Sequence, residues 1–256
     1  MRCLTHLLLL GLLAITPLLS GCSGLHPFAK VVPPGPRAFD FATDTLAVRA
    51  AEPAGMQTQE ALASLALRGH VDAAVARQFF LHAGFDPAQP PPSNERRIAL
   101  VREVLGRKAD AASSAERRVV IPGYANLNEF SRLQGHLLRA ESWLVCPCQG
   151  RAPMVMKALG GSGAQKNAAA SELAGSLGAN RPVLVRLYRH HALKYDRSLL
   201  LFRAEEQDGE VRFAGYDPAA PKQPVQLSFN RASRAFALSD DAAASGPALA
   251  VEIHAR

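Results

Sequence analysis

Two cysteines separated by one proline, Cys146 and Cys148, precede a histidine pair, His190 and His191, and then an aspartate, Asp217. A thiolate beside an imidazolium ion is an activated nucleophile, and a carboxylate can orient the imidazole ring. The chain order Cys, His, Asp therefore permits a cysteine hydrolase or transferase that acts on peptide or acyl bonds. Any chain with several residues of each type offers this order, so the order alone does not establish an enzyme.

The Cys146-Pro147-Cys148 stretch has three other interpretations. The two thiols can form a redox pair, but a disulfide across so short a loop is strained and easily reduced. They can bind zinc, but a structural zinc site needs four ligands and the chain has no second cysteine pair. The favoured interpretation is an ordinary loop with one thiol packed and one open to oxidation. We therefore predict no metal and no cofactor.

The composition is that of a globular protein with an aliphatic core. Of the 256 residues, 48% are hydrophobic and 20% are charged, whereas only 6% are aromatic. So few aromatic residues argue against an aromatic carbohydrate platform or a base-stacking surface. The formal net charge is +7, but no basic stripe interleaved with aromatic residues occurs, so nucleic acid is not predicted as a partner.

The first residues have the pattern of an export signal. Arg2 precedes an apolar run from Leu7 to Leu19, which is too short to span a bilayer as a stable helix. The run ends in Leu19-Ser20-Gly21-Cys22, which resembles the lipobox of bacterial lipoproteins. The resemblance implies that residues 1–21 are a signal peptide, that Cys22 carries the lipid, and that Ser23 directs the protein to the outer membrane. In the alternative interpretation the signal is cleaved and Cys22 is a bystander.

Residues 22–38 read as a tether between the lipidated cysteine and the folded part. Four prolines in residues 27–36 favour an extended polyproline chain, which can hold the domain roughly 40 Å from the membrane. The membrane is thus a predicted partner through the lipid anchor. Arginine side chains also suit anionic lipid headgroups. Solvated surface charge is the better interpretation of the arginines, because no run of five like charges occurs.

Residues 39–118 are predicted to be mainly helical. Gly69 is expected to end one helix and Asp72 to cap the next, with His70 and His82 near helix ends as capping or packing groups. Ser93 or Asn94 can cap a third helix. The predicted buried face of the second helix consists of Val71, Val75, Phe79 and Ala83.

The strongest helix signal follows residue 119. Asn126 and Glu129 stand three residues apart, as in a capping box, at the start of a helical apolar repeat. The repeat consists of Leu127, Phe130, Leu133, Leu137 and Leu138. All five are therefore predicted to face the core.

After residue 180 the apolar period becomes that of strands. Six strands are predicted over 183–188, 198–204, 211–216, 225–229, 234–238 and 249–254. Asp208-Gly209 is a hairpin turn signal between the second and the third of them. N-terminal helices followed by an antiparallel sheet define an α+β fold. The glycine-rich segment before them, residues 160–178, is predicted as a loop and a short helix, since it lacks the Gly-Lys-Ser/Thr ending of a phosphate loop.

The chain also resembles papain-like cysteine peptidase domains, and in particular a group of bacterial lipoproteins related to that fold. The matching stretches are Phe41–Thr45, Ile121–Tyr124, Phe130–Ser131, Ser198–Phe202 and Tyr216–Pro218. The resemblance implies a papain-like architecture, with residues 119–256 as the α+β region. In active relatives a cysteine at a helix start is the nucleophile, a histidine heading a strand is its base, and an Asn or Asp on the next strand orients the histidine.

Two of these three catalytic parts are missing at the matched positions. Asp217 matches the orienting residue, but Arg197 stands where the histidine is expected, and no cysteine heads the helix that begins near Leu127. Arginine cannot serve as a base near neutral pH, because its pKa exceeds about 12. We therefore expect a non-catalytic papain-like domain on the periplasmic side of the outer membrane that binds a peptide, an envelope polymer or a protein partner.

Overall fold

A computed structural model describes residues 37–47, 59–109, 111–145, 163–189, 194–239 and 249–255. Cys22, Cys146, Cys148, His190 and His191 lie outside these ranges, so the predictions about them stay predictions. Within the described ranges, no helix combines the length and the apolar character needed to cross a membrane.

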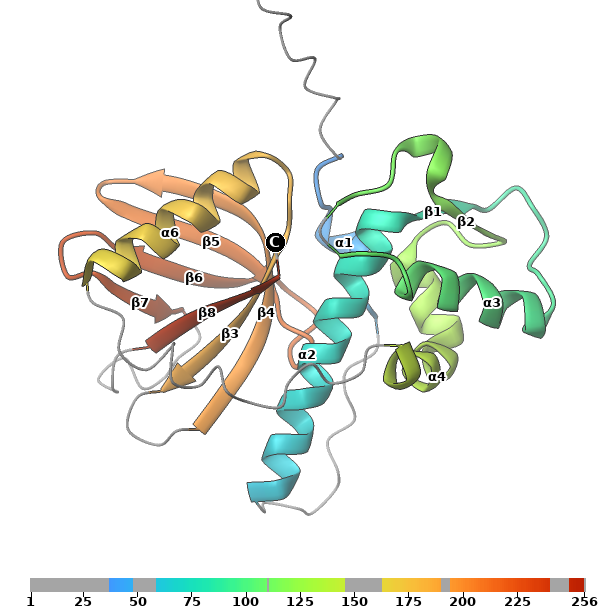
Figure 1. The fold of residues 1–256 in the computed structure, drawn as a ribbon, viewed down its shortest axis with the longest axis horizontal. Coiled ribbons are helices and arrows are strands. Elements are labelled where there is room, and N and C mark those ends of the chain that lie inside the picture. Colours follow the sequence, from blue (N-terminus) through green and yellow to red (C-terminus); the bar gives the residue numbers. More distant parts are fainter. Residues whose placement is uncertain are drawn as a thin grey trace, which may run out of the picture. The chain divides into compact units, whose positions relative to one another are not determined.

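The described chain is an α+β fold in which helices precede an antiparallel sheet (Figure 1). The first part contains α1 (Phe41–Asp44), α2 (Gln59–His82), β1 (Ala83–Asp86), α3 (Asn94–Leu105), a 3-10 turn η1 (Ala115–Arg117), β2 (Val119–Pro122) and α4 (Leu127–Val145). The second part contains α6 (Gly163–Gly178), β3 (Val183–Arg189), β4 (Lys194–Gln207), β5 (Glu210–Tyr216), β6 (Val225–Asn230), β7 (Ala235–Leu238) and β8 (Leu249–Ala255). The predicted fold class is confirmed at this level.

Strands β3 to β8 form a closed antiparallel barrel in chain order, because β8 pairs back onto β3. Each of the six predicted strands coincides with one of these strands. Asp208 and Gly209 form the tight turn between β4 and β5, with φ values of 51° and 77°. Glycine adopts such positive φ values without steric cost, which explains the turn signal in the sequence. Strands β1 and β2 pair in parallel as a separate two-stranded sheet.

Helix α2 runs without interruption through residues that were expected to end one helix and cap another. Gly69 and Asp72 both lie inside it, so the predicted break is wrong. A glycine inside a helix costs about 1 kcal/mol. Burial of an apolar face outweighs this cost. Val71, Val75 and Phe79 of the predicted face are buried, whereas Ala83, also predicted for it, begins β1.

The predicted starts of α3 and α4 are confirmed. Ser93 caps α3 by accepting a hydrogen bond from the Arg96 backbone N–H at 3.3 Å. At the start of α4, the Glu129 N–H donates to the Asn126 side chain at 2.9 Å, while the Glu129 carboxylate accepts from the Ala125 N–H at 2.7 Å. This reciprocal pair satisfies donors that a helix N-terminus leaves free.

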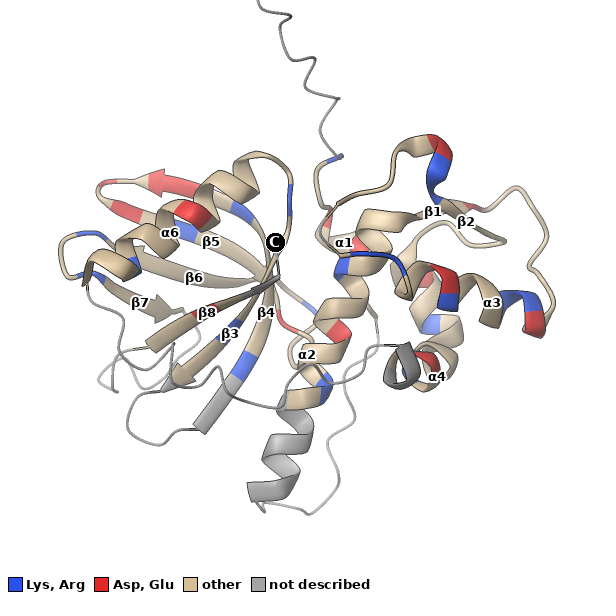
Figure 2. Ribbon diagram, viewed as in Figure 1, with Lys and Arg blue, Asp and Glu red and all other residues tan. Residues whose placement is uncertain are grey.

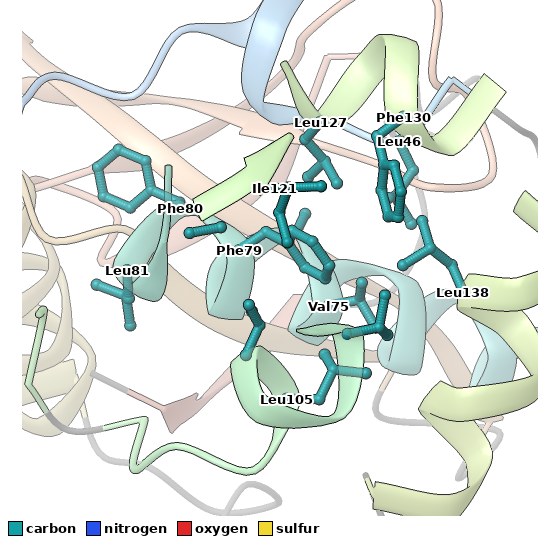
Figure 3. Packing of buried hydrophobic residues seen from close by; sticks show 14 of the residues in the cluster. Leu46, Val75, Phe79, Phe80, Leu81, Leu105, Ile121, Leu127, Phe130 and Leu138 are labelled. Atoms are coloured by element: carbon teal, nitrogen blue, oxygen red, sulfur yellow. The ribbon is translucent and has the colours of Figure 1, made fainter. Parts of the chain in front are cut away.

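Two hydrophobic cores stabilise the fold. The first lies among α2, α3, α4 and the β1–β2 sheet, where Phe79 and Phe130 approach each other (Figure 3). Leu184, Leu200 and Tyr216 of the barrel belong to the same core, so barrel side chains pack with α2. The second core fills the barrel and includes the buried face of α6 (Ala170, Leu173, Leu177).

The N-terminal segment, residues 37–47, packs on both parts. The Phe39 ring lies between Phe80 of α2 and Phe202 of β4, with ring centroids 5.3 Å and 5.1 Å away. Arg37 forms a bidentate ion pair with the buried Asp44, and this hydrogen bonding raises the pKa of Arg37. The chain therefore enters the domain at the contact between α2 and the barrel.

Candidate functional site

The predicted site residues Arg197 and Asp217 meet in an ion pair. Arg197, on β4, donates from Nη1 to Oδ2 of Asp217 at 2.6 Å. Asp217 follows the end of β5 and is only 1% exposed, whereas the Arg197 side chain is 22% exposed. The other Asp217 oxygen accepts the Ala219 backbone N–H at 2.8 Å, which stabilises the turn after β5. The carboxylate thus serves both the ion pair and the turn.

This pair cannot perform general base catalysis. A guanidinium ion has only donors and stays charged at physiological pH. The Asp217 carboxylate holds the guanidinium of Arg197. The Arg197 side chain therefore presents a fixed positive charge and offers no proton acceptor.

His70 of α2 lies against the same strand, β4, and was missed as a site residue. Its Nδ1 is 3.0 Å from the Ser198 hydroxyl oxygen and 3.3 Å from Nε of Arg186, on β3. Arginine Nε is always a donor, so Nδ1 of His70 accepts in its contact with Arg186. Ser198 is only 1% exposed, so this serine–histidine contact is a buried contact between α2 and the barrel.

A further carboxyl group, that of Asp72, is buried one helical turn beyond Arg68. Burial raises its pKa to about 6, although Arg139 of α4 and Arg68 of α2 act in the opposite direction. Burial, with a smaller contribution from the Asp72 charge, also raises the pKa of Tyr216 at the end of β5. Carboxyl groups that titrate near neutral pH are enriched at functional sites.

Helix α4 begins at Leu127, as predicted, and the helix that packs along β4 is α2. His70 lies in the middle of α2, so its placement near a helix end is wrong. His82 does end α2, and it packs: Nδ1 is 2.9 Å from the Ser113 hydroxyl and Nε2 is 2.9 Å from the Lys108 carbonyl oxygen. Burial lowers the pKa of His82.

Only a long-range signal could have shown the link between His70 and the strands. His70 and Ser198 are 128 residues apart in the sequence, so no local spacing relates them. Within the strands, Ser198 pairs directly with Arg186, which places both side chains on the same face of the sheet.

The charges of the described residues show no concentrated binding patch. Figure 2 shows Lys and Arg positions spread over the helices and the strands, with Asp and Glu positions among them. Several of the arginines are in ion pairs, such as Arg102 with Glu141 at 2.5 Å and Arg231 with Glu206 at 2.8 Å. No group of three or more His, Cys, Asp or Glu side chains in the described ranges could hold a metal ion.

A hollow of about 350 Å³ lies between the N-terminal segment, the end of α6 and strand β4. Its apolar wall includes Phe39, Leu177 and Phe202, of which the two phenylalanine rings are stacked. Asn180 and Arg203 are polar groups of its lining. The hollow can therefore accept an apolar side chain next to a polar main chain.

Comparison with known families gives one match. Residues 70–141 match the model of a family described as "Domain of unknown function (DUF8321)". No curated protein and no solved structure matched the chain. The match begins at His70 and ends at Glu141, so it covers the helical half of the site, while Arg197, Ser198 and Asp217 lie beyond it.

Proposed function

We propose that this protein is a lipid-anchored envelope protein whose papain-like domain binds a peptide, an envelope polymer or a protein partner without cleaving it. The ion pair between Arg197 and Asp217 carries the proposal. The resemblance assigns these two positions to the base and the orienting residue, and a guanidinium ion cannot accept a proton. The lipid anchor at Cys22 and the outer-membrane location rest on the sequence pattern.

The arrangement of α2 and the barrel supports papain-like descent. A helix packs along an antiparallel barrel, and the site residues follow one another along the chain from α2 to β4 to the end of β5. This is the order of nucleophile, base and orienting residue in papain-like enzymes. Here the three elements carry His70, Arg197 and Asp217. None of the three is a nucleophilic cysteine.

The hollow beside Phe39 and Phe202 supports peptide binding. Its volume of about 350 Å³ exceeds that of a single large side chain, and its lining combines apolar walls with polar groups. Such a lining suits an apolar residue within a peptide.

A thiol-directed suicide probe tests the absence of catalysis. We expect no covalent labelling of the full-length protein by an epoxide or vinyl sulfone peptide probe, because the matched positions lack a base and a nucleophile. Mass spectrometry of the treated protein provides the measurement. Labelling of Cys146 or Cys148 that disappears in a His191→Ala variant would establish the cysteine hydrolase instead.

Selection of phage-displayed random heptapeptides tests the binding site. The wild-type protein should enrich peptides with a shared apolar residue, and Ala174→Trp, which fills the hollow, should weaken their binding at least tenfold. Ala232→Trp, on the exposed turn after β6, is the matched control. Peptides that bind both variants equally would remove the hollow from the proposal, and selection of no peptide would favour a polymer or protein ligand.

Metabolic labelling with palmitate tests the anchor. We expect label in the wild-type protein and none in Cys22→Ala, with the wild type in the outer-membrane fraction. Two or three acyl chains contribute about 0.8 kcal/mol per buried methylene and hold a protein firmly on a bilayer. A cleaved but unlabelled wild-type protein in the soluble periplasmic fraction would show that Cys22 is a bystander.

A further inference from the structure

Asp72 is a carboxyl group inside the fold with no partner to neutralise it directly. It lies within α2 and is 9% exposed; Arg139 of α4 acts on its charge, and its charge acts on Tyr216 at the end of β5. Among the described residues, no side chain or backbone group forms a hydrogen bond or an ion pair with it. An ionised carboxylate in such a place loses hydration without compensation, which costs free energy.

The charged groups around Asp72 come from three elements. Arg68 of α2 and Arg139 of α4 favour its ionised form from a distance, while Tyr216 of β5 is close enough to sense its charge. Four pairs of other ionisable groups near α2 are engaged with one another. They are Arg186 with His70, Arg197 with Asp217, Arg102 with Glu141, and Arg37 with Asp44.

We propose that Asp72 is a proton-sensitive lock at the contact of α2 with α4 and β5. When the carboxyl is neutral, the buried contact is closed and stable. When the carboxyl is ionised, the contact loosens and admits water around Asp72. This inference goes beyond the proposed ligand-binding function and does not depend on it.

The direction of the pH dependence follows from the two states of the chain. Burial raises the pKa of Asp72 from an ordinary 3.8 to about 6 in the folded protein. Below about pH 4 the group is protonated in both states and costs nothing. As the pH rises from about 4 to 6, the unfolded chain releases the proton first, so the folded state becomes progressively less stable. Above about pH 6 the cost is complete.

Denaturation of wild type and Asp72→Asn at several pH values tests the lock. Asparagine keeps the shape of the neutral carboxyl, so the unfolding equilibrium constant of the wild type should exceed that of the variant by roughly a hundredfold at pH 7.5. The ratio should fall to roughly tenfold at pH 5. Because the wild type and the variant are compared at the same pH, the effects of all other titrating groups cancel in the ratio. Asp208→Asn, on the exposed β4–β5 turn, is the matched control; its unfolding equilibrium constant should equal that of the wild type at both pH values.

Hydrogen exchange locates the effect, after correction for the intrinsic exchange rate. Amides of α2 and β5 should open more often at pH 7.5 than at pH 5 in the wild type, and equally often in Asp72→Asn. If the ratio of the unfolding equilibrium constants of wild type and Asp72→Asn stays the same across this pH range, the proposal is overturned. Should the variant not fold, the carbon-13 shift of the wild-type Asp72 carboxyl decides: titration near pH 4 overturns the lock, and titration near pH 6 supports it.

Discussion

Replacement of Arg197 by methionine is expected to lower the free energy of unfolding by about 3 kcal/mol. The substitution leaves the Asp217 carboxylate, 1% exposed, without its guanidinium partner. A buried charge that loses its partner costs far more than the loss of an exposed ion pair. Urea denaturation followed by circular dichroism measures the change.

A double-mutant cycle separates the ion pair from the other contacts of Arg197. Asp217→Asn removes the charge from the second partner, so the double variant should be more stable than the sum of the two single effects predicts. Arg203→Met is the matched control, because Arg203 and Glu205 form an ion pair 3.3 Å apart with both side chains 67% exposed. It should cost less than about 1 kcal/mol. Equal small costs at Arg197 and Arg203 would contradict the buried pair.

The outcome bears on function as well as on stability. A strongly coupled Arg197–Asp217 pair means that the aspartate is occupied in holding the guanidinium, and that the turn after β5 depends on it. Such a pair leaves no group at this point of the site to take a proton from a nucleophile. It remains compatible with ligand binding, which needs a rigid frame rather than a base.

Short-range signals accounted for most of the secondary structure. The strand pattern, the Asp208-Gly209 turn and the caps at Ser93 and Asn126 all depend on neighbouring residues, and all are found in the structure. Alternation places one face of a strand in the core, and a capping side chain reaches only a few residues along the chain. Both effects can therefore be predicted from the local sequence.

Features that depend on distant contacts could not be predicted in this way. Closure of the barrel requires β8 to pair with β3, and no residue in either strand specifies that partner by itself. Helix α2 continues through Gly69 because its apolar face is buried, which local propensity does not show. Arg197 and Asp217, which the sequence comparison singled out, do pair, but the contact of Ser198 with His70 depends on how α2 packs.

Phe130→Ala is expected to lower the free energy of unfolding by about 4 kcal/mol. The Phe130 ring is fully buried and touches Tyr124, Phe79 and Phe85, with ring centroids 4.8 Å, 6.0 Å and 6.3 Å away. Removal of the ring leaves a cavity at the point where α4, α2 and β1 meet (Figure 3), and the surrounding aromatic side chains can fill it only in part. Thermal and urea denaturation measure the loss.

Leu133→Ala, on the same helix, is the control that separates packing from sequence pattern. The helical repeat predicted that Leu133 faces the core, but this side chain is 49% exposed, so that prediction is wrong. The helix changes direction here, because the next residue, Gln134, has non-helical φ and ψ angles of −125° and 24°. An exposed leucine contributes little, and its replacement should cost less than about 0.5 kcal/mol. Comparable losses for Leu133→Ala and Phe130→Ala would mean that α4 follows the regular repeat and packs in a different rotation.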